Sequence, residues 1–458
     1  MAEEPLTNTL AEVRRLLESG RRADAAALIA PLLPPDQAEI FEDLSIEDQT
    51  HLLQVVEARQ AANILEELDE DDAASLAESL NISDLARVLD EMEPDEAADL
   101  LGDLDPGLRQ ESLRQIADAA EIQSLLRYAD DTAGGLMTSD YYVFPEETDV
   151  GTIFNHIRTQ PIQDEEIPYV YAVDQDGRLT GIARLADLIR AHPELPLLAI
   201  IDTQFVSIEA GEDQEIAAQL LNRYDLLALP VLDAAGHLLG VITVDDAIAA
   251  LEQEATEDIY KSAGILSTRD NQSVKSDLMV HGPIWRSWMV RIPFLLVTMI
   301  GGILAGGVIG VFEDALETVV VLAFFIPIVM GMGGNSGTQS VGIFIRGYVL
   351  GHIDPHAFRK HLLRELGVGL GLGVILGLLA GLAATLWQGN PTIGLVVGLS
   401  LVCTITLATG LGFLVPLLIN KIGIDPAVAS EPVITTINDF TGMLIYFLFA
   451  SLFMSGLM

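Results

Sequence analysis

Two short polar segments interrupt apolar stretches in the last third of the sequence. Residues 331–340 hold four glycines and five polar side chains, and residues 435–442 hold Asp439, the only acid well inside a long apolar run. A carboxylate in the hydrocarbon core is costly unless it faces water, a cation or a polar partner. No Lys or Arg lies at a matching depth to pair with it. The two segments therefore predict a cation site and disfavour anionic substrates, although a protonated or hydrogen-bonded packing Asp fits the same position.

The apolar stretches around these segments are long enough to span a bilayer, which takes about 20 residues each. With the N-terminus inside, five spans place all seven basic residues of this region on one side, as cytoplasmic loops prefer. The sequence therefore predicts an α-helical bundle of five spans with the C-terminus outside. Pro327 and Pro416 predict a kink or tilt in the second and fourth spans. The predicted spans are residues 287–311, 316–345, 362–387, 392–420 and 432–457.

Charge is divided unevenly along the 458 residues. Residues 1–280 hold 59 acids and 17 bases, whereas residues 281–458 hold 8 acids and 7 bases. An acidic soluble part therefore precedes a nearly neutral apolar part. No nucleic-acid partner is expected, because phosphates need a positive face, and a single globular enzyme domain is excluded. The first ten residues are acidic and lack an apolar core, so the soluble part is expected in the cytoplasm.

The first part of the soluble region repeats with a period of 24 residues. Asp24, Asp48, Asp72 and Glu96 occupy equivalent positions in residues 20–105. Each is expected in the first turn of a helix, where an acid suits the helix dipole. The repeat predicts an all-α superhelical domain, a small solenoid, within residues 1–130.

The next part contains one pattern twice. Residues 169–182 and 229–242 each read as strand, turn and strand, followed by a helix. Tandem units of this kind resemble a pair of CBS domains, which are α/β folds. We expect the first domain at residues 131–200 and the second at residues 201–248.

The second copy retains residues that bind nucleotides in many CBS pairs. Thr243 and Asp246 match the Thr and Asp that often hold a nucleotide ribose there. The first copy has Ala183 or Arg184 where the hydroxyl would lie. The resemblance thus raises ATP or another adenine nucleotide as a cofactor at the second copy.

Residues 249–280 connect the soluble part to the spans. Apolar residues alternate there with acids, which predicts an amphipathic connecting helix, or plug, near the membrane surface. A solvated linker helix fits the same pattern. The membrane domain then occupies residues 281–458.

The order of these parts resembles the MgtE family of magnesium channels and transporters, and the resemblance covers nearly the whole chain. Its most specific parts are residues 333–339 in the second span and 438–442 in the fifth. The resemblance implies a homodimer in the plasma (inner) membrane of a prokaryote, with a pore on the dimer axis. It implies that Asp439 binds the permeating ion. The pore-lining residues expected on this basis are Gly334, Asn335, Gly337, Thr338, Thr435 and Asn438.

The chemistry of the spans agrees with Mg²⁺. This ion usually keeps several waters beside one or two carboxylates, which one Asp439 from each subunit would supply. No set of Cys or His in the spans favours Zn²⁺ or Cu⁺. An inside-negative potential favours entry of a divalent cation by about 4.6 kcal/mol per 100 mV. No phosphate-binding Walker motif is present, so an ATPase is unsupported and no enzyme activity is expected.

The resemblance also implies that cytosolic Mg²⁺ binds between the soluble domains and closes the pore. Divalent cations that bridge acidic faces would lower their repulsion and favour a compact, closed state. Any one of these acids could instead be a solvated surface residue. The candidate ligands are Asp95, Glu96, Asp99, Asp233, Glu252, Glu254, Glu257, Asp258 and Asp425.

Two other functions fit part of the pattern. A carrier for another divalent cation, such as Co²⁺, could use Asp439 in the same way. A membrane-anchored nucleotide or metal sensor that conducts nothing would need no polar residues inside the spans. The sequence leaves open the choice between channel and carrier, and the selectivity for Mg²⁺ over Co²⁺ or Mn²⁺.

Overall fold

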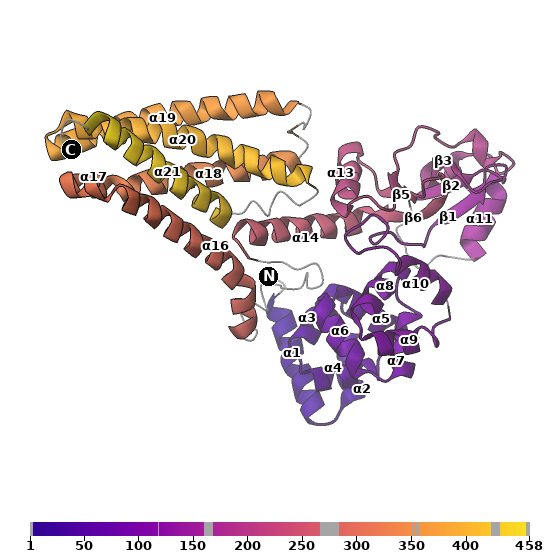
Figure 1. Ribbon diagram of the computed structural model, residues 1–458. Helices are drawn as coiled ribbons and strands as arrows, with labels where there is room; N and C mark the ends of the chain where they lie inside the picture. Colours follow the sequence, from indigo (N-terminus) through magenta and orange to yellow (C-terminus); the bar gives the residue numbers. More distant parts are fainter. Residues whose placement is uncertain are drawn as a thin grey trace. The chain divides into compact units, whose positions relative to one another are not determined.

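The chain forms two compact units, residues 1–252 and 253–458 (Figure 1). Of the predicted ligands, Asp425 lies outside the described residues, and so do residues 266–280 of the predicted connecting helix. The computed structural model describes residues 3–117, 119–159, 168–265, 284–349, 352–353, 357–422 and 431–454.

Short α-helices build the first part of unit 1, and ten of them precede the first strand in the described residues. From α2 to α9 their starts form two interleaved series with a spacing of 24 residues, so each repeat is a pair of helices rather than one. The predicted superhelical domain is confirmed. The helices are α1 (Glu3–Glu18), α2 (Arg22–Ile29), α3 (Pro34–Glu42), α4 (Ile46–Leu53), α5 (Ala58–Glu67), α6 (Glu70–Ser79), α7 (Ile82–Leu89), α8 (Pro94–Asp103), α9 (Pro106–Ser112) and α10 (Ala119–Leu125).

Capping residues and prolines fix where these helices begin. The side chains of Ser45 and Asn81 accept hydrogen bonds from the backbone N–H groups of Asp48 and Asp84. Such caps satisfy donors that the first helical turn leaves unpaired. Prolines open α3, α8 and α9, where the missing N–H costs nothing.

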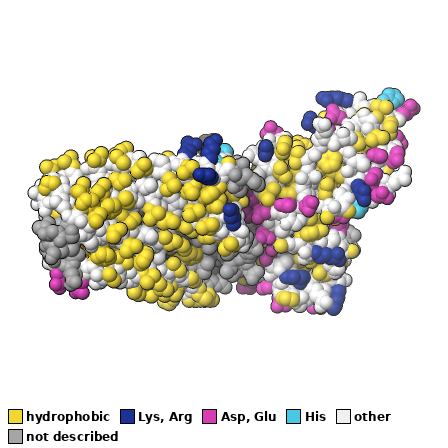
Figure 2. Space-filling model, turned by 45° about the horizontal axis from the view of Figure 1, so that its top comes forward, with side chains coloured by type: hydrophobic (Ala, Val, Ile, Leu, Met, Phe, Trp, Pro, Cys, Tyr) yellow, Lys and Arg dark blue, Asp and Glu magenta, His cyan; other side chains and the backbone are white. Residues whose placement is uncertain are grey.

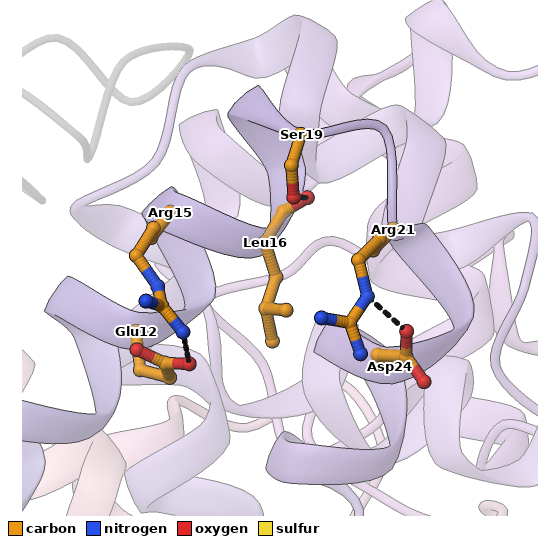
Figure 3. Close-up of polar contacts among 6 residues, drawn as sticks. All are labelled: Glu12, Arg15, Leu16, Ser19, Arg21 and Asp24. Atoms are coloured by element: carbon orange, nitrogen blue, oxygen red, sulfur yellow. Dashed lines mark hydrogen bonds and ion pairs between the residues drawn. The ribbon is translucent and has the colours of Figure 1, made fainter.

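Residues close in sequence also define the turn between α1 and α2 (Figure 3). Ser19 Oγ donates to the carbonyl oxygen of Leu16 at 2.8 Å. Gly20 then takes a φ of 74°, which residues with a Cβ rarely adopt. The Arg21 guanidinium pairs with Asp24, one of the repeated acids, at 2.6 Å. The repeated acid therefore supports the first turn of its helix.

Two small sheets of the same construction follow. In each, the first strand pairs in parallel with the second, and the second pairs antiparallel with the third. The predicted α/β pair is confirmed, and the structure adds β1 and β4, which are too short to show a clear alternation. The first copy holds β1 (Tyr142–Pro145), α11 (Val150–Thr159), β2 (Tyr169–Val173), β3 (Leu179–Arg184), α12 (Leu185–Arg190) and the 3₁₀ turn η1 (Leu197–Ala199). The second holds β4 (Ile208–Glu209), α13 (Gln214–Tyr224), β5 (Ala228–Leu232) and β6 (Leu238–Thr243).

Backbone hydrogen bonds cross between the two copies. Thr138 exchanges two of them with Val241 of β6, at 2.8 and 3.0 Å, and Asp202 exchanges two with Ile182 of β3, also at 2.8 and 3.0 Å. The segment before the first sheet thus extends the second sheet, and the segment after residue 200 extends the first. The predicted limits, 131–200 and 201–248, therefore separate segments that fold together.

The helix α14 (Val244–Ser262) begins directly after β6 and continues past residue 248. The second CBS copy and the start of the connecting helix thus share one helix, which the predicted limit at residue 248 divides. The helix ends at Ser262, and Gly264, two residues further on, has a φ of 73°. A Cβ there would lie 2.6 Å from Pro432 at the start of the last span, so only glycine fits this contact.

Five helices in the described residues of unit 2 are long and apolar enough to cross a membrane, as predicted. The second span runs over Val320–Tyr348, close to the predicted residues 316–345. It begins as a 3₁₀ turn and continues as α18, and a short helix precedes it. Pro327 lies in the first turn of α18 and starts that helix rather than kinking it. The elements are α16 (Ile284–Val311), α17 (Glu313–Thr318), η2 (Val320–Phe325), α18 (Ile326–Val349), α19 (Phe358–Gln388), α20 (Pro391–Lys421) and α21 (Glu431–Met454).

Glycines set the spacing of these helices. A Cβ at Gly377 of α19 would lie 2.6 Å from the carbonyl oxygen of Gly398 on α20, so the two backbones are in contact. Gly302 and Gly306 of α16 have nothing within 4 Å of such a Cβ. The face of unit 2 seen in Figure 2 is mostly hydrophobic, with charged side chains at its ends. This distribution suits a helical bundle in lipid.

Candidate functional site

The two polar segments meet where α18 packs against α21. Asn438 Nδ2 donates to the carbonyl oxygen of Gly333 at 3.3 Å. A Cβ at Gly337 would lie 2.0 Å from Asn438 Nδ2, and one at Gly334 would lie 3.3 Å from Thr435 Cγ2. The absence of side chains on α18 therefore lets it approach the polar segment of α21.

The burial of Asn438 determines where Asp439 points. The Asn438 side chain is 1% exposed and lies against α18. Asp439 follows about 100° further round the helix, and its side chain is partly exposed. The carboxylate thus lies at the edge of the contact between α18 and α21, not inside it.

The opposite side of α18 carries exposed amides. Asn335 and Gln339 are both exposed, and because they are four residues apart they lie on one face of the helix. Gly331 and Gly342, which have nothing within 4 Å of a Cβ, flank them. Amide groups at membrane depth need water or a polar partner. This face of α18 is therefore unsuited to lipid.

The predicted pore-lining residues divide between these two environments. Asn335 is exposed, and Thr338 and Thr435 are partly exposed. Gly334, Gly337 and Asn438 are buried in the contact between α18 and α21. The lining role of all six remains a prediction. Gln339 was not among them, although its spacing from Asn335 places the two on one face.

A second acid also lies within the membrane helices. Ser340 Oγ on α18 donates to Glu365 Oε1 on α19 at 2.7 Å, and Ser340 is 1% exposed. From the sequence alone, Asp439 is the only acid deep in a predicted span, because Glu365 is only the fourth residue of the predicted span 362–387. Glu365 is recognised by its hydrogen bond with Ser340 on another helix, and not by the residues beside it in the sequence.

In unit 1, three predicted ligands lie on α8, and Asp95 is the most buried of them. It is 6% exposed, and its Oδ1 has no hydrogen-bond partner among the residues that the structure describes. Burial, followed by the nearby Asp246 carboxylate, raises the pKa of Asp95 to about 7, although the Thr138 hydroxyl opposes this change. The structure thus brings α8, the segment before the first sheet and the start of α14 together around one carboxyl group.

The neighbouring acids of α8 experience the same causes. Burial and the carboxylates of Asp95 and Asp99 raise the pKa of Glu96 well above its usual value. The surrounding protein and the carboxylates of Asp95 and Asp130 raise the pKa of Asp99, although part of its side chain is exposed. Crowded acids of this kind are stabilised by a bound proton or cation.

These groups do not form a ready ligand set. Within the described ranges, no three side chains of His, Cys, Asp or Glu are close enough to hold a metal ion. On α14, Glu257 pairs with Lys261 at 2.8 Å. Glu254 and Asp258 lie on the same side of that helix by their spacing, and Glu252 is exposed.

Asp233 has a turn-forming role that needs no metal. Its Oδ1 accepts the backbone N–H groups of Ala235 and His237 at 2.8 Å, and its Oδ2 contacts His237 Nδ1 at 2.8 Å. The His237 contacts lower the pKa of Asp233 to about 2. Asp174 makes the equivalent turn in the first copy. The role of Asp233 as a metal ligand remains a prediction.

The predicted nucleotide pair is in contact. Thr243 Oγ1 donates to Asp246 Oδ2, and the same Asp246 carboxylate raises the pKa of Asp95. Asp246 therefore belongs to the acidic region around α8 as well as to the pair that matches nucleotide-binding residues.

Family models match most of the chain. The model of the MgtE divalent cation transporter matches residues 326–449, that of the MgtE intracellular N domain matches residues 32–131, and that of the CBS domain matches residues 133–194 and 199–253. The magnesium transporter MgtE of Thermus thermophilus is 37% identical over 337 residues, which cover 74% of this chain and 73% of that protein. The chain belongs to the MgtE family. The magnesium transporter MgtE of Bacillus subtilis is 34% identical over 346 residues, with 76% and 75% covered.

Solved structures match the soluble unit. The soluble part of a magnesium transporter gives a TM-score of 0.50 at 31% identity and covers 55% of this chain and 99% of that chain. The cytosolic domain of the Mg²⁺ channel MgtE in complex with ATP gives a TM-score of 0.50 at 31% identity, with 52% and 99% covered. MgtE is a family of transporters, not of enzymes. Its transporter match spans both polar segments of unit 2.

Proposed function

We propose that this MgtE chain is a homodimeric channel that imports Mg²⁺ across a prokaryotic plasma membrane. The observation that carries the proposal is a set of polar side chains on the membrane helices that packing does not bury. Asn335 and Gln339 are exposed, and Asp439 is partly exposed. A second copy related by two-fold symmetry would enclose them in a water-filled path. The pore is then lined by α18 and α21 of both copies, with the N-terminus in the cytoplasm and the C-terminus outside.

The oxygen chemistry of this path supports a hydrated Mg²⁺. Two Asp439 carboxylates, one from each copy, would balance the charge of the ion while it keeps most of its waters. The Asn335 and Gln339 amides would then contact the hydration shell. Relatives named as magnesium transporters support the same cargo.

We further propose that cytosolic Mg²⁺ favours the closed state. Like charges crowd around Asp95, so a divalent cation bound there would stabilise the compact arrangement of unit 1. The chain just after α14 contacts the membrane helices, because Gly264 packs against Pro432 on α21 and Phe294 on α16. A change in the position of α14 would therefore be felt at α21.

A nucleotide at the second CBS copy is a further part of the proposal. The related cytosolic domain was solved in complex with ATP, and Thr243 and Asp246 match the residues that hold a ribose in such pairs. Because Asp246 also faces Asp95, nucleotide and cation binding would affect each other. ATP titrated with and without Mg²⁺, monitored by calorimetry, tests this coupling.

Current recordings on purified protein in planar bilayers, with Mg²⁺ as the only cation, test the pore. We expect single-channel currents, and we expect Asp439→Ala to abolish them because it removes the ion-binding carboxylate. Glu431→Ala is the matched control, since it removes an exposed acid at the start of the same helix. Uptake without single-channel steps would indicate a carrier, and no flux of any divalent cation would indicate a sensor. Normal currents from Asp439→Ala would reject the pore assignment.

A further inference from the structure

The helix α18 has two polar sides with different surroundings. Asn335 and Gln339 are exposed, whereas Ser340 is buried and lies about 140° round the helix from Asn335. Gly333 and Gly337 lie close to Ser340 on this buried side and pack against α20 and α21. The contacts of the buried side therefore determine which residues the other side presents.

Most contacts on the buried side have little directional preference. A Cβ at Gly412 of α20 would lie 2.3 Å from the carbonyl oxygen of Gly337, so this contact fixes a distance between helices. Hydrogen bonds depend on angle as well as distance. The bond from Ser340 to Glu365, at 2.7 Å, is a directional contact between α18 and α19. A hydrogen bond to a carboxylate is also stronger than one between neutral groups.

We propose that Glu365 is a positioning residue that fixes the rotation of α18 through Ser340, so that Asn335 and Gln339 face the pore. The inference rests on the proposed pore. Without an acceptor at residue 365, α18 loses its hydrogen bond to α19 and keeps the weaker one from Asn438 to Gly333, at 3.3 Å. The helix then turns enough to move the amides out of the path of the hydrated ion. Glu365 acts through α18 and does not bind the ion itself.

Substitutions at residue 365 separate positioning from ion binding. Glu365→Gln removes the charge but keeps an oxygen that can accept from Ser340, whereas Glu365→Leu removes both. We expect Mg²⁺ uptake into proteoliposomes to stay within about twofold of wild type for Glu365→Gln. We expect it to fall about tenfold for Glu365→Leu and for Ser340→Ala, the change that about 1.4 kcal/mol produces in an equilibrium. The double variant Ser340→Ala with Glu365→Leu should lose no more than either single variant, because the two residues share one contact.

Cysteine labelling reports the rotation directly. In full-length protein carrying Cys403→Ser, which removes the single native cysteine, Gln339→Cys should react readily with a charged thiol reagent, and Ser336→Cys, which is buried, should not. Adding Ser340→Ala should slow labelling at residue 339 and permit it at residue 336, while Glu365→Gln should leave both unchanged.

Each contrary result has a distinct meaning. If Glu365→Gln is as impaired as Glu365→Leu, the charge matters and the positioning role is rejected. If Ser340→Ala changes neither uptake nor labelling, the contact does not hold α18 and the proposal fails. If Gln339→Cys is unreactive in otherwise unaltered protein, the pore assignment fails, and this inference fails with it.

Discussion

Asp439 and Asp95 are both helical carboxylates, but they belong to different surroundings. Asp439 lies in a unit with few charges, beside a contact that glycines make possible. Asp95 lies in a unit with many acids, is almost fully buried, and faces the Asp246 carboxylate. The surroundings of Asp439 depend on the close packing of neutral groups. Those of Asp95 depend on the protons or cations that neutralise the neighbouring carboxylates.

In the proposed function, the two units have separate tasks. Close helix packing holds a fixed geometry whatever the ionic conditions, which suits a path for ions. Crowded carboxylates change their free energy with bound protons and cations, which suits a region that responds to the cytosol.

Close packing at the contact between α18 and α21 should tolerate no added methyl group. Gly337→Ala would place a Cβ 2.0 Å from Asn438 Nδ2 and 2.8 Å from Ile434 Cγ2, and overpacking of this kind costs about 1–3 kcal/mol. We expect Mg²⁺ uptake to be lost. Gly371→Ala on α19, with nothing within 4 Å of its Cβ, is the control and should transport normally. Wild-type uptake by Gly337→Ala would show that this contact does not hold the site.

Closure of the proposed pore by cytosolic Mg²⁺ should depend on the acids of the connecting helix. Replacing Glu252, Glu254, Glu257 and Asp258 by their amides should leave a current that persists at millimolar cytosolic Mg²⁺, because less cation is bound in the compact state. Patch recordings measure this persistence. The charge-matched control replaces four exposed acids elsewhere, which are Glu39, Glu47, Glu57 and Glu111.

Two other outcomes of that experiment are informative. A channel that is silent at every Mg²⁺ concentration would mean that repulsion among these acids normally opposes the compact state. A response equal to that of wild type would place the sensor elsewhere and would weaken the division of tasks between the units.

Asp95 should make unit 1 less stable as pH rises. Its pKa is about 7 in the folded state against 3.8 ordinarily, so the folded state holds the proton more tightly and stability falls as pH rises from 4 to 7. The difference corresponds to about 4 kcal/mol. Asp95→Asn should raise the Tm of residues 1–252 at pH 8 and change it little at pH 4.

Thermal unfolding at both pH values, with Asp176→Asn as a control at an exposed turn, checks this sign. Added Mg²⁺ should raise the Tm of the unsubstituted segment at pH 8 more than that of Asp95→Asn. Equal Tm values for the two proteins at pH 8 would mean that the buried charge of Asp95 does not lower the stability of the folded state.

Asp233 should show the opposite dependence on pH with a smaller size. Its pKa is about 2 because of the hydrogen bonds from His237, so its contribution is present above pH 4 and is lost as pH falls through 2. Asp233→Asn should lower the Tm slightly at pH 7 and hardly at all at pH 2. Asp174→Asn, in the equivalent turn of the first copy, should also lower the Tm at pH 7. A rise in Tm at pH 7 would contradict the turn role.

The helices, strands and spans could be predicted from the sequence. The 24-residue repeat, the two strand pairs and the five spans follow from the spacing of apolar residues along short stretches, and the structure has all of them. The sequence also placed the two polar segments in the second and fifth spans. Such patterns are local, because each depends on the periodicity of one helix or strand.

The long-range contacts of the side chains and strands depend on the tertiary structure. Thr138 pairs with Val241 of the other sheet, Asn438 binds a carbonyl oxygen 105 residues away, and Glu365 meets Ser340 across two helices. The residue types admit many partners for each of these groups. Helix packing and strand pairing select one, because contacts over such separations depend on the arrangement of whole elements and not on the residues beside them.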